Sequence, residues 1–278
     1  MENSPQVSVI IPSLDGYRQG NVEKLFSDLR EQTFRDIEIK LIKGIRPNGR
    51  ARNVGSRQAK GEILIFIDDD IRLGHNKVLE NLIRPLEADN RLAMTGASVE
   101  IDKDAGYLQK EYNKIRNFSS PLKQELDYQG RVGHACLAIK KSIFEELGGE
   151  NEDLIRGTDV DLNMRIKAKG YRVAVVPHTW VYHLMPNSIT KLIKEAFICG
   201  SGAAYAAKIL PEVFGLPKIK FTSYTVKTKL GALIYKIIGS LIILPIYILT
   251  FKPVHFLFYT FHTAGYIYGW LKFRSITQ

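Results

Sequence analysis

Three consecutive aspartates, Asp68, Asp69 and Asp70, follow an apolar run at residues 62–67. Such a short β-branched run predicts a buried strand. Ligands of open α/β sheets bind beyond the carboxyl ends of the strands, so we expect these carboxylates to face a crevice. Like charges packed this closely repel unless a cation neutralises them, and hard oxygen ligands suit Mg²⁺ or Mn²⁺. Because Mg²⁺ usually takes only one or two protein carboxylates together with phosphates, a metal here implies a phosphorylated ligand. The alternative is a solvated acidic turn.

A second acidic cluster contains Thr158, Asp159 and Asp161. Thr158 or Asp159 can cap the helix that follows, and acids are favoured near a helix N-terminus. A carboxylate fixed at a helix start above a crevice is also well placed to act as a general base toward a hydroxyl group. Both interpretations are open for this cluster.

His183 ends a short apolar segment at residues 179–182. A single histidine is more often a packed or surface residue than a ligand, but a place beside the acidic sites would make it a third metal ligand.

Strand and helix patterns alternate along the first two-thirds of the chain, which predicts an α/β fold with a doubly wound, mostly parallel sheet. Expected strands lie at residues 7–12, 37–42, 63–67, 92–99, 135–139, 171–176 and 179–183. Expected helices lie at residues 21–31, 50–60, 76–87, 107–118, 141–147 and 160–168.

Charge and cysteine content indicate the surroundings of the protein. The 278 residues carry a net charge of +10, of which residues 186–278 hold +9 (11 basic against 2 acidic side chains). A basic, apolar tail favours an anionic membrane surface over nucleic acid, because the lysines alternate with long aliphatic runs. Two cysteines form no disulfide framework and suit a reducing compartment. The first residues lack a signal-peptide pattern, so we expect the chain to start in the cytosol.

Two segments near the C-terminus, residues 231–251 and 253–271, are close to the length that spans a bilayer, about 20 residues. Basic residues flank the pair, so the positive-inside rule predicts a hairpin with both ends on the cytosolic face. The alternatives are two helices lying in the membrane interface, or a soluble helical extension.

Several motifs together resemble the family-2 glycosyltransferases of the GT-A fold. They lie, in order, at residues 7–12, 50–55, 59–64, 68–70, 135–139, 147–149, 159–165, 170–171 and 183. Several independent motifs in one order make the resemblance specific.

The resemblance implies inverting transfer of a sugar from a nucleotide diphosphate sugar. It implies that Asp159 is the catalytic base, and that Asp70, with His183, binds a divalent cation bridging the two phosphates. It also implies a donor-binding set: Pro12, Ser13, Lys43, Arg50, Arg52, Asp68 and Asp69. Guanidinium groups suit phosphate oxygens, although Arg50 and Arg52 could instead lie on a solvated helix face.

Two positions depart from the family pattern. Lys43 stands where the second strand of family members commonly ends in an acid that contacts the nucleobase, so the donor base cannot be assigned by analogy. Thr158 stands where an acid normally precedes the catalytic aspartate, so the family's usual contact to the acceptor is not carried over to this position.

We therefore expect a membrane-attached glycosyltransferase that uses Mn²⁺ or Mg²⁺, a nucleotide diphosphate sugar and a lipid-linked or glycan acceptor. We expect a catalytic domain at residues 1–185 on the cytoplasmic side of the cell membrane, a basic helical linker at 186–229 and membrane-associated helices at 230–278. The rival functions are a sugar-phosphate nucleotidyltransferase, a phosphatase with an aspartyl nucleophile, and a non-catalytic nucleotide-sugar-binding module.

Overall fold

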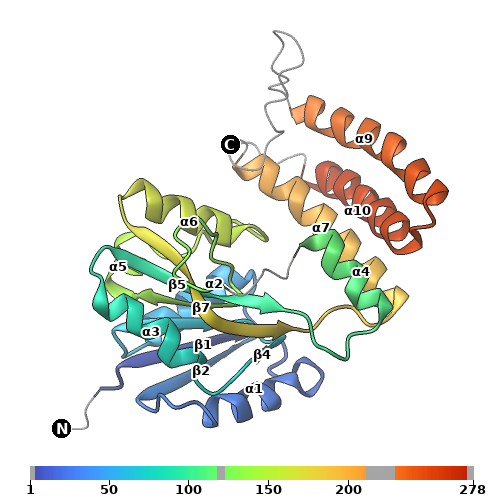
Figure 1. Ribbon diagram of the computed structural model, residues 1–278. Coiled ribbons are helices and arrows are strands. Elements are labelled where there is room, and N and C mark those ends of the chain that lie inside the picture. Colours follow the sequence, from blue (N-terminus) through green and yellow to red (C-terminus); the bar gives the residue numbers. More distant parts are fainter. Residues whose placement is uncertain (1–3, 118–122, 211–228, 274–278) are drawn as a thin grey trace. The chain divides into compact units, whose positions relative to one another are not determined.

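A seven-stranded sheet carries the predicted site. In the computed structural model, which describes residues 4–117, 123–210 and 229–273, the strand order is β2-β1-β3-β6-β5-β7-β4 (Figure 1). The strands are β1 (Val7–Ser13), β2 (Ile37–Lys43), β3 (Ile63–Ile67), β4 (Ile71–Leu73), β5 (Leu92–Glu100), β6 (Cys136–Lys140) and β7 (Arg172–His183).

The expected α/β class and the mostly parallel sheet are both confirmed, because five of the seven strands run in one direction and only β4 and β6 run opposite to them. β1 runs parallel to β2 and β3, and β5 runs parallel to β7. β6 is antiparallel to β3 and β5, and β4 is antiparallel to β7. β6 begins at the edge where β3 ends, because Cys136 pairs with Ile67. The chain therefore enters β6 without the crossover that a parallel pair needs.

Helices cover both faces of this sheet because apolar side chains alternate along its strands. Val9 and Ile65 face a core that includes α1 and α3, whereas Ile10 and Leu64 face a second core that includes α2, α5 and α6. These helices are α1 (Asn21–Arg30), α2 (Asn48–Gln58), α3 (Val78–Ala88), α5 (Lys141–Glu146) and α6 (Thr158–Ala168), and the turn η1 (Arg18–Gly20) precedes α1.

β7 is a single strand, whereas the sequence predicted two short strands separated by Pro177. Its pairing with β5 jumps from Val175 to Trp180, and β5 carries an irregularity at the same place. Proline lacks the amide proton that a ladder hydrogen bond requires, so the strand passes through Pro177 as an unpaired stretch. β4 was not predicted because it has only three residues.

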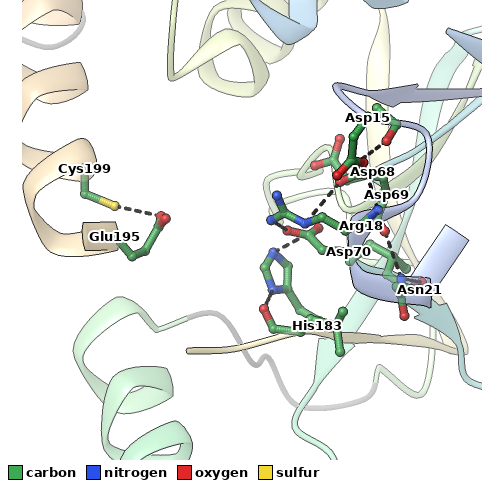
Figure 2. Close-up of polar contacts among 12 residues, drawn as sticks. Asp15, Arg18, Asn21, Asp68, Asp69, Asp70, His183, Glu195 and Cys199 are labelled. Atoms are coloured by element: carbon green, nitrogen blue, oxygen red, sulfur yellow. Dashed lines mark hydrogen bonds and ion pairs between the residues drawn. The ribbon is translucent and has the colours of Figure 1, made fainter. Parts of the chain in front are cut away.

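A second compact unit is helical and comprises Asp104–Arg116, Asp153–Gly157 and Met185–Gln278. Its described helices are α4 (Tyr107–Arg116), α7 (Ile189–Ile209), α9 (Lys229–Leu249) and α10 (Pro253–Lys272). α7 and α10 approach closely, because an added Cβ at Gly200 or Gly265 would collide with the backbone of the opposite helix. Inside this unit Glu195 accepts hydrogen bonds from Arg156 (2.7 Å) and from the Cys199 thiol (3.2 Å; Figure 2).

The membrane-spanning hairpin expected from the sequence is not found. Within the described ranges, no helix combines the length and the apolar character that crossing a bilayer requires. α10 contains two histidines, three tyrosines and two threonines, including His255 and His262. It also buries Val254 and Phe258 inside the helical unit.

Two adjacent glycines after α5 allow a matched test of the backbone near the site. Gly148 and Gly149 both have left-handed φ angles, +76° and +77°. Alanine at either position should therefore cost about 1–2 kcal/mol of unfolding free energy. An alanine Cβ at position 149 would also lie 2.6 Å from Asn53 Oδ1, whereas nothing lies within 4 Å at position 148.

We expect Gly149→Ala to lose about 1–3 kcal/mol more stability than Gly148→Ala, because only the first overpacks a buried contact. Urea unfolding of the two variants measures the difference. Equal losses would contradict the placement of Asn53 against Gly149.

Candidate active site

The three aspartates lie in the tight turn that joins β3 to β4. The Ile71 amide donates to the Asp68 carbonyl oxygen (3.2 Å), and the Asn21 side chain donates to the carbonyl oxygens of Asp69 (2.9 Å) and Ile71 (3.0 Å). Ser13, at the end of β1, donates its hydroxyl to the Asp69 carboxylate (2.6 Å). Burial raises the pKa of Asp69, although Ser13 and the Arg18 guanidinium oppose the rise. Because of these contacts, the segment is not a solvated acidic turn.

Asp70 lies between a cation and a histidine (Figure 2). Arg18 Nη2 is 2.7 Å from Asp70 Oδ2, and His183 Nε2 is 3.6 Å from Asp70 Oδ1. The pairing of β4 with β7 brings the two predicted ligands together, because Ile71 is opposite His183 and the Leu184 amide donates to the Asp70 carbonyl oxygen (2.9 Å).

The orientation of His183 suits a metal ligand. Its Nδ1 lies 3.1 Å from the Leu184 carbonyl oxygen, which can only accept a hydrogen bond, so Nδ1 carries a proton. In the neutral ring, Nε2 then presents a lone pair toward the Asp70 carboxylate, and a cation would favour that arrangement.

The residues present therefore fit a divalent cation with few protein ligands. In the described part of the chain, no group of three or more His, Cys, Asp or Glu side chains gathers to hold a metal. Asp70 and His183 would supply one oxygen and one nitrogen, and water and substrate phosphates would complete the coordination of a bound Mn²⁺ or Mg²⁺.

The two predicted arginines of α2 have different surroundings. Arg52 is buried, and its Nη2 lies 2.5 Å from Asp68 Oδ1. Its Nε is buried with no hydrogen-bond partner among the described residues. Arg50 is well exposed, with its Nε 3.7 Å from Glu152. Arg50 therefore lies on a solvated helix face, whereas Arg52 does not.

The other donor-side residues lie at the ends of β1 and β2. Pro12 is buried in β1 and pairs with Ile42. Lys43, the exposed last residue of β2, extends across Gly16, where an added Cβ would lie 2.5 Å from Lys43 Cε. Lys43 and Ser13 thus both border the loop that follows β1.

Asp159 lies in the first turn of α6, next to Thr158. Its Oδ2 is 3.8 Å from Arg131 Nε, and its negative charge contributes to the raised pKa of Arg52. Asp161 instead pairs with Arg165 (2.7 Å) on the same helix. Of the two acids in this cluster, Asp161 therefore has the closer ion pair, and Asp159 remains the predicted base.

Sequence reasoning missed four residues that the structure places around these groups. Arg18 contacts Asp70, and Asn21 holds the acidic turn. His134 and Glu150 form a buried pair close to Thr158. Each belongs to a loop or an element end, where spacing does not report which residues meet. Of these four residues, only Glu150 had a signal in the sequence, because it directly follows Gly148 and Gly149.

Comparison with known proteins gives the family. A profile described as "Glycosyltransferase like family 2" matches residues 3–197. The O-antigen biosynthesis protein RfbC of Myxococcus xanthus is 26% identical over 181 residues, which cover 58% of this chain and 14% of that protein. The uncharacterised glycosyltransferase MJ1057 of Methanocaldococcus jannaschii is 25% identical over 170 residues, covering 60% of this chain and 58% of that protein. The chain thus spans less than two-thirds of these curated relatives.

Solved structures share the fold. The mannosyltransferase PcManGT from Pyrobaculum calidifontis, in complex with GDP-Man and Mn²⁺, aligns with a TM-score of 0.59 at 17% identity, covering 96% of this chain and 88% of its own. GalNAc-T7 with UDP, GalNAc and Mn²⁺ aligns with a TM-score of 0.50 at 17% identity, covering 78% and 52%. With the profile match over most of its length, the chain belongs to the glycosyltransferase family 2-like proteins.

Proposed function

We propose that this protein is a metal-dependent, inverting glycosyltransferase. It moves a sugar from a nucleotide diphosphate sugar to a hydroxyl or phosphate group of a lipid-linked or glycan acceptor. The observation that carries the proposal is the meeting of Asp70 and His183 at the β3–β4 turn, in the same compact unit as Asp159. GDP-Man and Mn²⁺ in the complex of PcManGT support the donor class and the ion.

On the donor side, Asp70 and His183 would hold Mn²⁺ or Mg²⁺. The bound cation would act as a Lewis acid on the departing nucleoside diphosphate. Arg18 now neutralises Asp70, so a cation at Asp70 would free this guanidinium for the diphosphate oxygens. Ser13, Lys43 and Arg52 border the β1 loop or the acidic turn. We assign them to nucleotide binding, together with Pro12, Arg50, Asp68 and Asp69.

On the acceptor side, Asp159 acts as the general base. Its carboxylate takes the proton of the acceptor group while the acceptor oxygen forms a bond to the anomeric carbon. The bond from that carbon to the diphosphate oxygen breaks, and its electron pair leaves with the diphosphate. A single displacement of this kind inverts the anomeric carbon.

A lipid-linked acceptor would require the enzyme to reach a membrane surface. α9 exposes large aliphatic side chains, among them Leu241, Ile242 and Leu249 at 68%, 61% and 77% exposure. Apolar patches of this kind mark interaction sites, and the +9 charge of residues 186–278 suits anionic lipid. We therefore place α9 in the interface of the cell membrane, with the catalytic unit on the cytoplasmic side.

The family membership favours this proposal over the rival functions. A nucleotidyltransferase would consume a nucleoside triphosphate, and a phosphatase would form a phosphoaspartate on Asp68 or Asp70. A non-catalytic module would bind the nucleotide sugar without turnover. Measurements of both turnover and binding distinguish these three rival functions from glycosyl transfer.

Mutations should distinguish the role of the metal ligand from the role of the general base. Asp70→Asn should weaken metal-dependent binding of nucleoside diphosphate, because it removes a ligand charge. Asp159→Asn should leave that binding near wild type and lower turnover about 10²-fold or more. Asp161→Asn is the matched control on the same helix. Calorimetric titration and a donor-consumption assay measure both effects, and full activity in Asp159→Asn would rule out the base.

Lys43 should contribute to donor binding. A lysine can only donate hydrogen bonds, so it suits a base carbonyl or a phosphate. We expect Lys43→Ala to weaken nucleoside diphosphate binding or to shift the preference between bases. Lys40→Ala, whose lysine pairs with Glu38 on the same strand, is the control. If Lys43→Ala binds every nucleoside diphosphate as the wild type does, Lys43 is only an exposed strand end.

The exposed face of α9 should bind anionic vesicles. Replacing both Leu241 and Ile242 with glutamate should lower vesicle binding about tenfold or more, since burial of each side chain is worth about 1.5–3 kcal/mol. Met164→Glu is the control, because Met164 is an exposed apolar residue of α6. Flotation with phosphatidylglycerol vesicles measures the effect, and a wild-type protein that does not float contradicts the membrane proposal.

A further inference from the structure

A buried acid–base pair lies beneath the start of α6. His134 Nε2 is 2.6 Å from Glu150 Oε1, and the two side chains are 8% and 0% exposed. The second carboxylate oxygen of Glu150 has no hydrogen-bond partner in the described part of the chain. Burying such groups costs free energy, and a buried ion pair is by itself weak grounds for a stabilising role. The pair therefore calls for another explanation.

One side of the pair reaches the residue next to the proposed base. His134 Nδ1 lies 3.3 Å from Thr158 Oγ1, and Thr158 is the first residue of α6. A hydroxyl can both donate and accept a hydrogen bond, so this contact is compatible with either form of the ring. Thr158 is itself buried, and Asp159 follows it directly. The side chain beside Asp159 is thus anchored to a buried group.

The other side of the pair reaches α2. The Glu150 amide donates to Asn53 Oδ1 (2.8 Å), and Asn53 Nδ2 donates to the Glu150 carbonyl oxygen (3.0 Å). The neighbouring Arg52 is ion-paired with Asp68. Burial alone would raise the pKa of Glu150, but the charges of His134, Arg52 and Arg165 outweigh burial and hold the pKa below its ordinary value. The backbone of Glu150 is therefore held by α2, beside the arginine that contacts Asp68.

We propose that Glu150 and His134 are positioning residues for the general base. They hold Thr158 through its hydroxyl, fix the place of Asp159 and connect it through Asn53 and Arg52 to Asp68 on the donor side. This inference rests on the proposed function. It also gives a role to Thr158, which stands where an acid usually precedes the base. The buried carboxylate of Glu150 contacts His134, and His134 contacts Thr158.

The test removes one hydroxyl while keeping the volume of the side chain. Thr158→Val deletes the group that contacts His134, and Thr158→Ser keeps it. We expect Thr158→Val to lower kcat about tenfold or more, because a small displacement of a base is costly. Donor affinity should stay within about twofold of wild type, and Thr158→Ser should restore most of kcat. Glu150→Gln, which keeps the shape and removes the charge, should lower kcat in the same way.

Hydrogen exchange supplies a second readout that does not depend on turnover. Peptides covering residues 157–165 should exchange faster in Thr158→Val and Glu150→Gln than in wild type and Thr158→Ser. Wild-type kcat and wild-type exchange in both variants would overturn the inference, as would equal losses of donor affinity and kcat. If the wild type binds nucleotide sugar without turnover, the proposed function fails, and the exchange data still decide whether the pair holds the start of α6.

Discussion

The constraint on which this site depends is the repulsion among three carboxylates in one short turn. Each of the three has its own compensating contact: Arg52 for Asp68, Ser13 for Asp69 and Arg18 for Asp70. Removing a compensating partner from a partly buried carboxylate leaves a charge that is costly to keep. The loop after β1, the start of α1 and the buried face of α2 are therefore all tied to the end of β3.

The mixed sheet follows from the same need to position charged groups. β4 has only three residues, yet its antiparallel pairing with β7 sets His183 opposite Ile71 and so beside Asp70. β7 runs in the same direction as β3, so its last residue reaches the edge of the sheet where β3 ends. The irregular pairing of β5 and β7 around Pro177 lets one strand serve both β5 and β4. The geometry of the site thus explains an edge strand that hydrophobic periodicity does not reveal.

Much of this fold could be predicted from the sequence, because its strands are short apolar runs and its helices have a clear apolar period. Asp70, His183 and Asp159 were singled out from the sequence, and the structure places Asp70 and His183 side by side, whereas the role of Asp159 stays a prediction. Strand direction could not be predicted, since the apolar pattern of β6 is the same in either orientation. Arg18, His134 and Glu150 were missed because their partners lie between about 16 and 52 residues away along the chain. The spanning hairpin was expected from length and apolar content, but no helix of the described residues meets the requirements for crossing a bilayer.

In the proposed mechanism, Asp70 and His183 hold a divalent cation against a nucleoside diphosphate. The most direct measurement is anomalous diffraction from crystals grown with Mn²⁺ and a nucleoside diphosphate. We predict a manganese peak bound by the Asp70 carboxylate and His183 Nε2, with the Arg18 guanidinium moved from Asp70 to the diphosphate. A nucleotide bound with no manganese at these two residues, and with the Arg18–Asp70 pair intact, would contradict it.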